Sequence, residues 1–136
     1  MSDRPRSERF ERGLAIRRDV LGDAYVNRSL AAATDFTWPA QVMATEKAWG
    51  ELWSRPGLDR KSRSILTLGV LAVMNRPQEF KAHVRGAINN GVSVAELQEI
   101  LLHLGGYAGF PVGLDAFRLA GEVLAEMGLG QDRAAT

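Results

Sequence analysis

The sequence predicts an all-α protein with six or seven helices of modest length. Apolar residues recur at helical spacing in nearly every segment, no segment alternates convincingly between apolar and polar residues, and caps or breakers divide the chain into helix-sized pieces. We expect a single domain over residues 1–136, because a chain of this length fits one domain. Residues 1–7 and 129–136 are expected to be frayed termini.

In the first half of the chain, caps and breakers mark the ends of the helices. The apolar stripe of the first helix contains Phe10, Leu14 and Leu21. It stops at Gly22, a residue type that often follows the last turn of a helix. A short apolar segment follows over residues 25–33. Thr37 then predicts an N-cap, with Pro39 in the first turn, for a helix that the Arg-Pro-Gly at 55–57 closes.

Caps and breakers also mark the ends of the helices predicted in the second half of the chain. Asp59 can cap a helix that runs to Asn75, and Pro77 then starts another that Asn90-Gly91 ends. The clearest local signal is Ser93-Val-Ala-Glu96, a capping box in which each side chain satisfies a main-chain donor of the other residue. The glycine-rich segment 105–111 should break or sharply bend the chain before a last helix from about Val112 to Met127.

The helix predicted between Ile65 and Met74 is apolar almost all round. This pattern is typical of a helix that is buried on every side. A chain of 136 residues has few ways to surround such a helix alone, so we expect a homo-oligomer whose subunits bury it between them.

The composition excludes several kinds of chemistry. The chain has no cysteine, which rules out a disulfide framework, a thiolate nucleophile and a dithiol redox pair. It has only two histidines and no metal-ligand spacing, so no metal is expected. A net charge of +1 gives no reason to expect nucleic acid or an anionic membrane as partner. No apolar run spans a bilayer and the charged first 18 residues do not resemble a signal peptide, so we expect a cytoplasmic protein.

The most informative motif is Glu79-Phe-Lys-Ala-His83, because side chains four residues apart share one face of a helix. A carboxylate and an imidazole that meet can form a proton-handling unit. The alternative is a surface ion pair worth a few tenths of a kcal/mol. His83 adjoins an apolar stripe, and three nearby basic residues could hold an anionic substrate, which favours the functional interpretation. These residues are Arg76, Lys81 and Arg85.

Other candidates have simpler explanations. His103 is expected to be a core or interface histidine. Trp49 and Trp53 lie four residues apart and are more often a packed pair than a pocket wall. A basic cluster surrounds the start of one helix and is either a solvated end or a clamp for a carboxylate. This cluster contains Arg55, Arg60, Lys61 and Arg63.

Several motifs in one order carry a family resemblance. They are Glu46-Lys-Ala-Trp49-Gly-Glu-Leu-Trp53 with its continuation to Arg63, Arg76-Pro-Gln-Glu79-Phe-Lys-Ala-His83-Val-Arg-Gly-Ala87, Asn90-Gly91-Val-Ser-Val-Ala-Glu96 and Tyr107-Ala-Gly109-Phe-Pro111. Together they closely resemble the carboxymuconolactone decarboxylase family over about residues 8 to 128. The N-terminal Arg17-Arg18-Asp-Val-Leu21-Gly22-Asp23 is similar to the γ-carboxymuconolactone decarboxylases themselves.

The resemblance implies an alkylhydroperoxidase-like (AhpD-like) helical subunit in a trimer or hexamer, without a cofactor. The wider superfamily includes proteins with a Cys-x-x-Cys-x-x-x-His motif. When its histidine is aligned on His83, Arg76 and Glu79 stand at the two cysteine positions. The chain therefore cannot perform that peroxidase chemistry, and the departure favours the decarboxylase branch.

The reaction that the resemblance implies converts 4-carboxymuconolactone to 3-oxoadipate enol-lactone and CO2 in protocatechuate catabolism, the β-ketoadipate pathway. We expect His83 to donate the proton, or a hydrogen bond to the developing oxyanion, while Glu79 orients it or acts as the acid itself. Arg76 or Arg85 would hold a carboxylate of this small dicarboxylate lactone. Trp49 or Tyr107 would form an apolar wall. The alternatives are a paralogue that acts on another lactone or keto acid, and a helical binding oligomer without activity.

Overall fold

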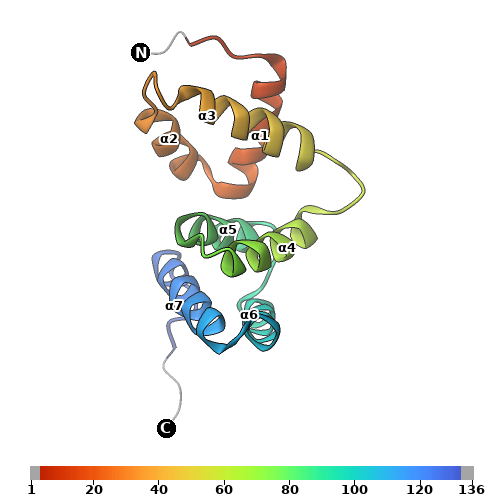
Figure 1. The fold of residues 1–136 in the computed structure, drawn as a ribbon, viewed down its shortest axis with the longest axis vertical. Coiled ribbons are helices and arrows are strands. Elements are labelled where there is room, and N and C mark those ends of the chain that lie inside the picture. The colour runs from red at the N-terminus through yellow and green to blue at the C-terminus, as the bar shows by residue number, and fades with distance from the viewer. Residues whose placement is uncertain (1–3, 133–136) are drawn as a thin grey trace. The chain divides into compact units, whose positions relative to one another are not determined.

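The computed structural model describes residues 4–132 and contains only helices within that range, which confirms the predicted fold class (Figure 1). In chain order the elements are α1 (Glu8–Leu21), α2 (Asp23–Ala32), α3 (Trp38–Met43), the π-helix η1 (Ala44–Leu52), α4 (Arg60–Val73), α5 (Pro77–Asn89), α6 (Val94–Ala108) and α7 (Phe110–Glu126). The chain forms two compact units, one that ends at Arg60 and one that begins at Lys61. Within the described range, no helix has the length and apolar character needed to cross a membrane.

The N-terminal unit is built around the packing of α1 against η1. Gly13 permits this packing, because a Cβ atom there would lie 2.0 Å from the main-chain oxygen of Thr45 and 2.9 Å from the nitrogen of Gly50. No larger residue fits unless the two helices move apart. Phe10 is fully buried nearby and packs against Trp38 with 5.5 Å between the ring centroids.

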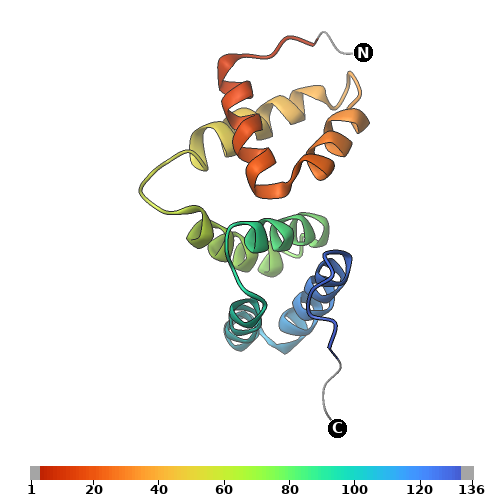
Figure 2. The same ribbon diagram turned by 180° about the vertical axis from the view of Figure 1, so that it is seen from behind.

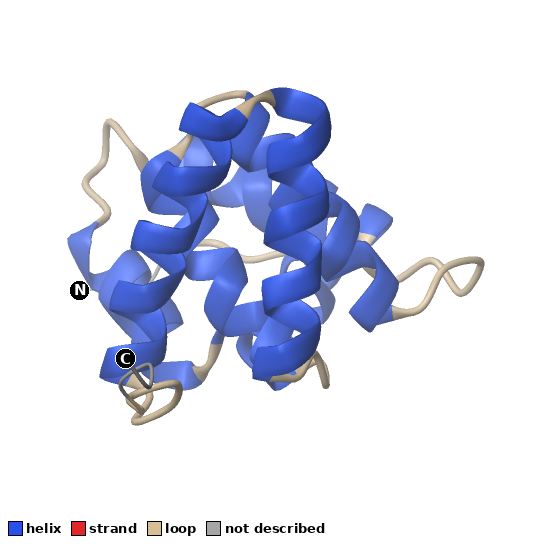
Figure 3. Ribbon diagram, turned by 90° about the horizontal axis from the view of Figure 1, so that it is seen from below, coloured by secondary structure: helices blue, strands red, loops and turns tan. Residues whose placement is uncertain are grey.

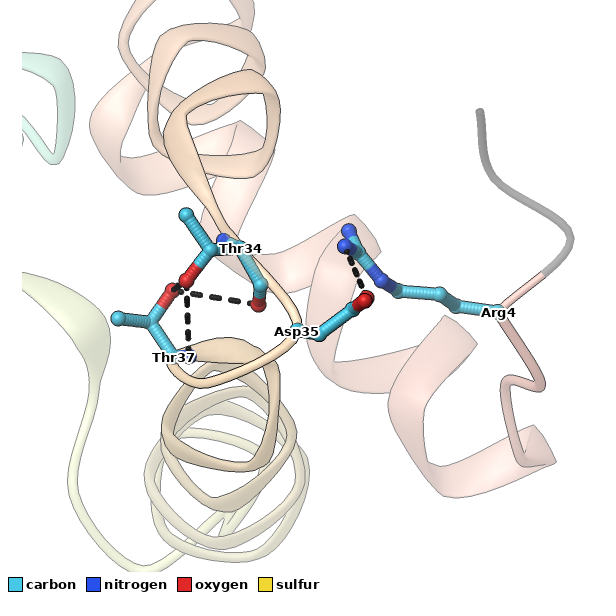
Figure 4. Close-up of polar contacts among 4 residues, drawn as sticks. All are labelled: Arg4, Thr34, Asp35 and Thr37. Carbon is cyan, nitrogen blue, oxygen red and sulfur yellow. Dashed lines mark hydrogen bonds and ion pairs between the residues drawn. The ribbon is translucent and has the colours of Figure 1, made fainter.

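The predicted end of α1 is confirmed, and Thr37 is the N-cap residue of α3 as predicted, although its side chain does not cap the helix. Gly22 ends α1 with a φ of 89°, a conformation that favours glycine. Thr37 lies just before α3, yet its side chain makes no capping hydrogen bond to that helix. Its hydroxyl instead accepts a hydrogen bond from the main-chain N–H of Thr34 at 2.8 Å, and the Thr34 hydroxyl accepts one from the N–H of Thr37 at 3.2 Å. The two threonines thus close the turn between α2 and α3 (Figure 4).

The same turn binds the N-terminal segment. Arg4 forms an ion pair with Asp35 at 2.9 Å, and its guanidinium lies 5.2 Å from the centroid of the Trp38 ring (Figure 4). The part of the expected fraying that concerns residues 1–3 and 133–136 lies outside the described residues.

The predicted helix before the Arg-Pro-Gly breaker is confirmed, but its second half is a π-helix. The main-chain N–H of Trp53 donates to the oxygen of Ala48, five residues earlier, at 2.9 Å. A π-turn inserts one extra residue per turn and is common at functional sites. The apolar spacing of the sequence does not distinguish it from an α-turn.

In the C-terminal unit, α6 and α7 lie side by side and are joined by a tight turn at Gly109 (Figures 1 and 2). Gly109 has a φ of 111°, so the predicted break in the glycine-rich segment is confirmed. The two helices approach closely at Gly105 and Gly113, where a Cβ on Gly113 would lie 2.8 Å from the Cα of Gly105. The capping box of Ser93 and Glu96 is also present as predicted.

One apolar core lies among the helices of this unit; Figure 3 draws all helices of the described chain in blue and the loops in tan. Its fully buried large residues include Leu68, Phe80, Val84, Leu97 and Leu101. The outer face of α4 remains exposed in the single chain, since Leu66, Val73 and Met74 are 62%, 57% and 59% exposed. Burial of this face by another subunit therefore stays a prediction.

Candidate functional site

The candidate catalytic side chains lie on α5. Pro77 at the first helical position and Asn90 after the last residue set the limits of this helix. Glu79 and His83 lie four residues apart within α5, so they share one face of the helix. Arg76 is the N-cap residue, with a non-helical main chain, just before the first turn.

His83 is half-buried, with its Nδ1 atom buried, while Glu79 is exposed. Burial lowers the pKa of His83 to about 4, and the negative charge of Glu79 acts in the opposite direction without reversing the shift. The imidazole is consequently neutral near pH 7. A neutral imidazole is a weak proton donor, but it can donate a hydrogen bond to a developing oxyanion or accept a proton.

The two candidate arginines occupy different positions along α5. Arg85 forms an ion pair with Glu126 of α7, with 3.0 Å between Nη2 and Oε2. Lys81, one turn earlier, pairs in the same way with Glu122 of α7 at 3.2 Å. These two cations therefore contact α7. Arg76, the residue before α5, is exposed and lines a hollow against α7 whose lining includes neither Glu79 nor His83.

The two candidate wall residues belong to different units. Trp49 lies on η1, is 5% exposed and stacks on Trp53 with 4.9 Å between ring centroids. Tyr107 lies on α6 and is 87% exposed, with its ring 4.9 Å from that of His103. Trp49 is thus a buried packing residue in this structure, whereas Tyr107 presents an open aromatic surface.

The C-terminal unit carries two hollows that differ in character. A broad groove of about 1270 Å³ runs between α4 and α6, and its walls are almost entirely aliphatic apart from Glu99, His103 and Tyr107. A smaller hollow of about 280 Å³ lies between α4, α5 and α7, and it includes Arg76 and Asp115 among its lining residues. Of the predicted site residues, Tyr107 thus lines the groove and Arg76 the smaller hollow.

The described residues 4–132 contain no group of three or more histidine, aspartate or glutamate side chains that could hold a metal ion. The chemistry of the candidate site consequently depends on one imidazole, one carboxylate and one guanidinium. Such a set can orient an anion, stabilise a developing negative charge and exchange one proton.

One buried charged residue was not predicted. Arg17 of α1 is only 7% exposed, and its Nη1 donates to the side chains of Gln41 at 2.9 Å and Thr45 at 3.3 Å. A signal for it exists in the sequence, because Arg17 falls on the apolar stripe of the first helix, three residues after Leu14 and four before Leu21.

Comparison with known proteins agrees with the motifs on these helices. Residues 40–122 match the model of the carboxymuconolactone decarboxylase family. A 4-carboxymuconolactone decarboxylase of Acinetobacter baylyi is 42% identical over 126 residues, which cover 93% of this chain and 94% of the relative. The nitrosuccinic acid decarboxylase npaB of Metarhizium robertsii is 46% identical over 118 residues, or 87% of this chain and 82% of the relative. The resemblance found in the sequence is thereby confirmed, and both relatives are named as decarboxylases.

Proposed function

Because the chain belongs to the carboxymuconolactone decarboxylase family, we propose that it converts 4-carboxymuconolactone to 3-oxoadipate enol-lactone and CO2. The observation that carries the proposal is the 42% identity, over 93% of this chain, to a relative named for that activity. The reaction would place the protein in bacterial protocatechuate catabolism. A cytoplasmic location is part of the same proposal.

The reaction needs little from the protein beyond binding and electrostatics. The bond between the ring carbon and the departing carboxylate breaks, and its electron pair moves through the ring C=C into the lactone carbonyl, which gives a dienolate. Addition of one proton alpha to the carbonyl then yields the enol-lactone. No electron is gained or lost overall, and the substrate itself supplies the electron sink that a cofactor provides elsewhere.

In this proposal His83 stabilises the dienolate. Its neutral imidazole donates a hydrogen bond to the developing oxygen anion, as a donor held in place before the reaction should. As the anion forms, the negative charge beside the imidazole raises its affinity for a proton, which allows His83 to take part in the later transfer. Glu79 shares the stripe and orients the ring from the exposed side.

Arg76 is the residue we propose to hold the carboxylate that the product retains. Its guanidinium is exposed at the N-terminal end of α5, and the helix N-terminus adds a further favourable interaction with an anion. Arg85 stays a less favoured candidate because Glu126 already neutralises it. Tyr107 remains the proposed apolar wall beside the departing carboxylate, where poor solvation favours neutral CO2.

A direct assay tests the proposal. The purified full chain is treated with a chelator, mixed with 4-carboxymuconolactone, and followed for release of CO2 and formation of the enol-lactone. We expect turnover that the chelator does not reduce, and loss of turnover in His83→Gln. Absence of any product with folded protein, or a requirement for added metal, would contradict the proposal.

Nitrosuccinic acid is a second candidate substrate, favoured by the 46% identity to the Metarhizium relative. Loss of CO2 from the carbon that bears the nitro group leaves the electron pair on the nitro oxygens as a nitronate, which one proton then neutralises. Both substrates thus carry two carboxylates and an internal acceptor of negative charge. Parallel measurements of kcat/KM on the two acids decide between them, and the larger value identifies the substrate class.

We also propose that the α4–α6 groove is an interface between copies of this chain, in a trimer or hexamer. The groove is lined by exposed aliphatic side chains of α4, including Leu66 and Val70, which are 62% and 47% exposed. Monomeric proteins rarely leave an apolar surface of this extent uncovered. Light scattering after size exclusion should give a mass several times 14.9 kDa. Leu66→Asp should reduce that mass, while Gln98→Asp, a charge on α6 outside the groove, should not. A wild-type mass of one chain would contradict the proposal.

A further inference from the structure

Partly exposed arginines such as Arg4 and Arg9 pair with carboxylates, whereas the buried Arg17 of the N-terminal unit does not. Within the described residues, several arginines form an ion pair with a carboxylate within 4.0 Å, and the side chains of these arginines are all at least partly exposed. Arg17 is buried, and no carboxylate of residues 4–132 lies within that distance of it. The buried guanidinium of Arg17 thus lacks a compensating charge.

Neutral groups hold one side of the Arg17 guanidinium. Nη1 donates to Oε1 of Gln41 and to Oγ1 of Thr45, and Thr45 is fully buried on the first turn of η1. These two hydrogen bonds fix the plane of the guanidinium. Gly13 allows α1 to approach η1 closely enough for both of them.

The other side of the guanidinium has no partner in the described part of the chain. Nε is buried and makes no hydrogen bond, and no acceptor is found for Nη2 either. Nε and Nη2 together form the edge on which carboxylates bind with two parallel hydrogen bonds. A buried donor left without an acceptor destabilises the fold, and more so when it is charged. An arginine also cannot escape this cost by losing its proton in the neutral range.

The surroundings match a single negative charge. Burial lowers the pKa of Arg17, whereas Tyr25 of α2 acts in the opposite direction, so the phenol lies near the guanidinium. Tyr25 and Gln41 are half-buried, which places the guanidinium one side chain below the surface. The neighbouring Arg18 also lowers the pKa of Arg17, but Arg18 itself pairs with Asp23. One uncompensated cation among neutral polar groups suits a carboxylate better than a doubly charged phosphate.

We propose that the Nε–Nη2 edge of Arg17 is a binding site for the carboxylate of a small organic acid, with Gln41 and Thr45 as the residues that position it. The site lies in the N-terminal unit and does not depend on the function proposed above. The carboxylate comes either from the reacting acid itself or from a separate small acid that binds to this unit. Both sources share the same recognition chemistry, and kinetics distinguish them.

Thermal unfolding of the full chain with sodium succinate, sodium acetate, sodium phosphate and sodium chloride at one ionic strength tests the proposal. Binding to the folded state alone should raise the melting temperature in a saturable way, by about 5 °C or more at 100 times the Kd. We expect this shift with succinate, a smaller one with acetate, and none beyond the chloride control with phosphate. A shift that is absent with both carboxylates, or equal with phosphate, overturns the proposal.

Variants test whether the side chain of Arg17 causes the shift in melting temperature. Arg17→Met should abolish the succinate shift, and Arg17→Lys should reduce it by more than half, since an ammonium cannot make the two parallel hydrogen bonds. Arg18→Met removes the same charge one residue along and should keep the full shift. If Arg17→Met does not fold, Arg17→Lys, which retains the charge, tests the assignment of the site to Arg17. A full succinate shift in either Arg17 variant overturns the assignment.

Two further measurements separate the sources of the carboxylate. If succinate inhibits turnover competitively and Arg17→Lys raises KM, the site binds the reacting acid. If succinate binds with the same affinity in the presence of saturating substrate, the site binds a separate acid. A protein without decarboxylase activity would still give the succinate shift, so failure of the proposed function does not decide this one.

Discussion

Each of the two units shields one basic side chain from water, and this burial leaves the two side chains in different charge states at pH 7. In the C-terminal unit, burial lowers the pKa of His83 to about 4, so the imidazole is neutral at pH 7. In the N-terminal unit, burial also lowers the pKa of Arg17, but a guanidinium is so strongly basic that it stays charged. The same desolvation therefore creates a neutral hydrogen-bond donor in one unit and a fixed cation in the other.

The difference shows what each site can do. A neutral imidazole can stabilise a charge that appears only during a reaction, which is the requirement for accelerating it. A permanent buried cation instead attracts a charge that is already present, which is the requirement for binding. The experiments below disturb one side of this comparison at a time, beginning with the largest effect.

Replacement of His83 by glutamine should have the largest effect. Loss of a donor to a developing oxyanion typically lowers kcat by about 100- to 1,000-fold. The melting temperature should change little, because glutamine is also neutral and similar in size. Lys81→Gln, on the opposite face of the same helix, serves as the control and should retain full turnover. A His83→Gln protein that keeps wild-type kcat would remove His83 from the mechanism.

Gly13→Ala should disturb the N-terminal unit most strongly. The added Cβ would meet the main-chain oxygen of Thr45 at 2.0 Å, so α1 must move away from η1 and carry Arg17 away from its anchors. Such overpacking costs about 1–3 kcal/mol or more in unfolding free energy, measurable by urea denaturation. Gly121→Ala in α7 is the matched control, because nothing lies within 4 Å of a Cβ there and alanine favours a helix. Equal stability of the two variants would contradict the close packing of α1 on η1.

The dependence of stability on pH should come from His83 and not from Arg17. The pKa of His83 is about 4 in the folded chain and 6.5 ordinarily, so the unfolded chain binds more protons between these values. Stability contributed by the neutral imidazole is therefore present above pH 6.5 and is lost as the pH falls toward 4. The difference between the folded and unfolded pKa values lowers the free energy of unfolding by about 2 kcal/mol at pH 5.

The difference between wild type and His83→Gln isolates this contribution from the carboxylates that also titrate below pH 5. Chemical denaturation at pH 7.5, 6.0 and 5.0 should show the two proteins diverging in the acid range. Parallel curves over that range would mean that the imidazole is not buried in the folded protein. Arg17→Met should give a curve parallel to that of wild type, since the guanidinium does not titrate there.

The sequence predicted those parts of the fold that local chemistry controls. The glycines at 22 and 109, the proline that opens α5 and the Ser93–Glu96 capping box each end or begin a helix through their own main-chain preferences, so each could be read from its residue type. The π-helical form of η1 could not be read in this way. It depends on packing against α1 at Gly13, which is a contact between segments some thirty residues apart.

The candidate site likewise contains some features that the local sequence predicts and others that it does not. The spacing of Glu79 and His83 was enough to place both on one face of α5, because a helix fixes it. The partner of Arg85 was not predictable, since Glu126 lies on another helix and no local pattern connects the two. Arg17 shows the opposite case. Its position on the apolar stripe of α1 was visible in the sequence, but its residue type argued against burial, because arginine is almost never fully buried unless it is paired.

The smallest predicted effects distinguish the two arginines of α5. Arg85→Met removes a partly exposed ion pair with Glu126 and should cost less than about 1 kcal/mol of unfolding free energy, with KM unchanged. Arg76→Met removes an exposed cation that has no ion pair within residues 4–132, so stability should hardly change, while KM should rise if the cation binds the retained carboxylate. Steady-state kinetics beside urea denaturation of both variants checks this. The reverse pattern, with KM raised only in Arg85→Met, would contradict the role proposed for Arg76 and assign the retained carboxylate to Arg85.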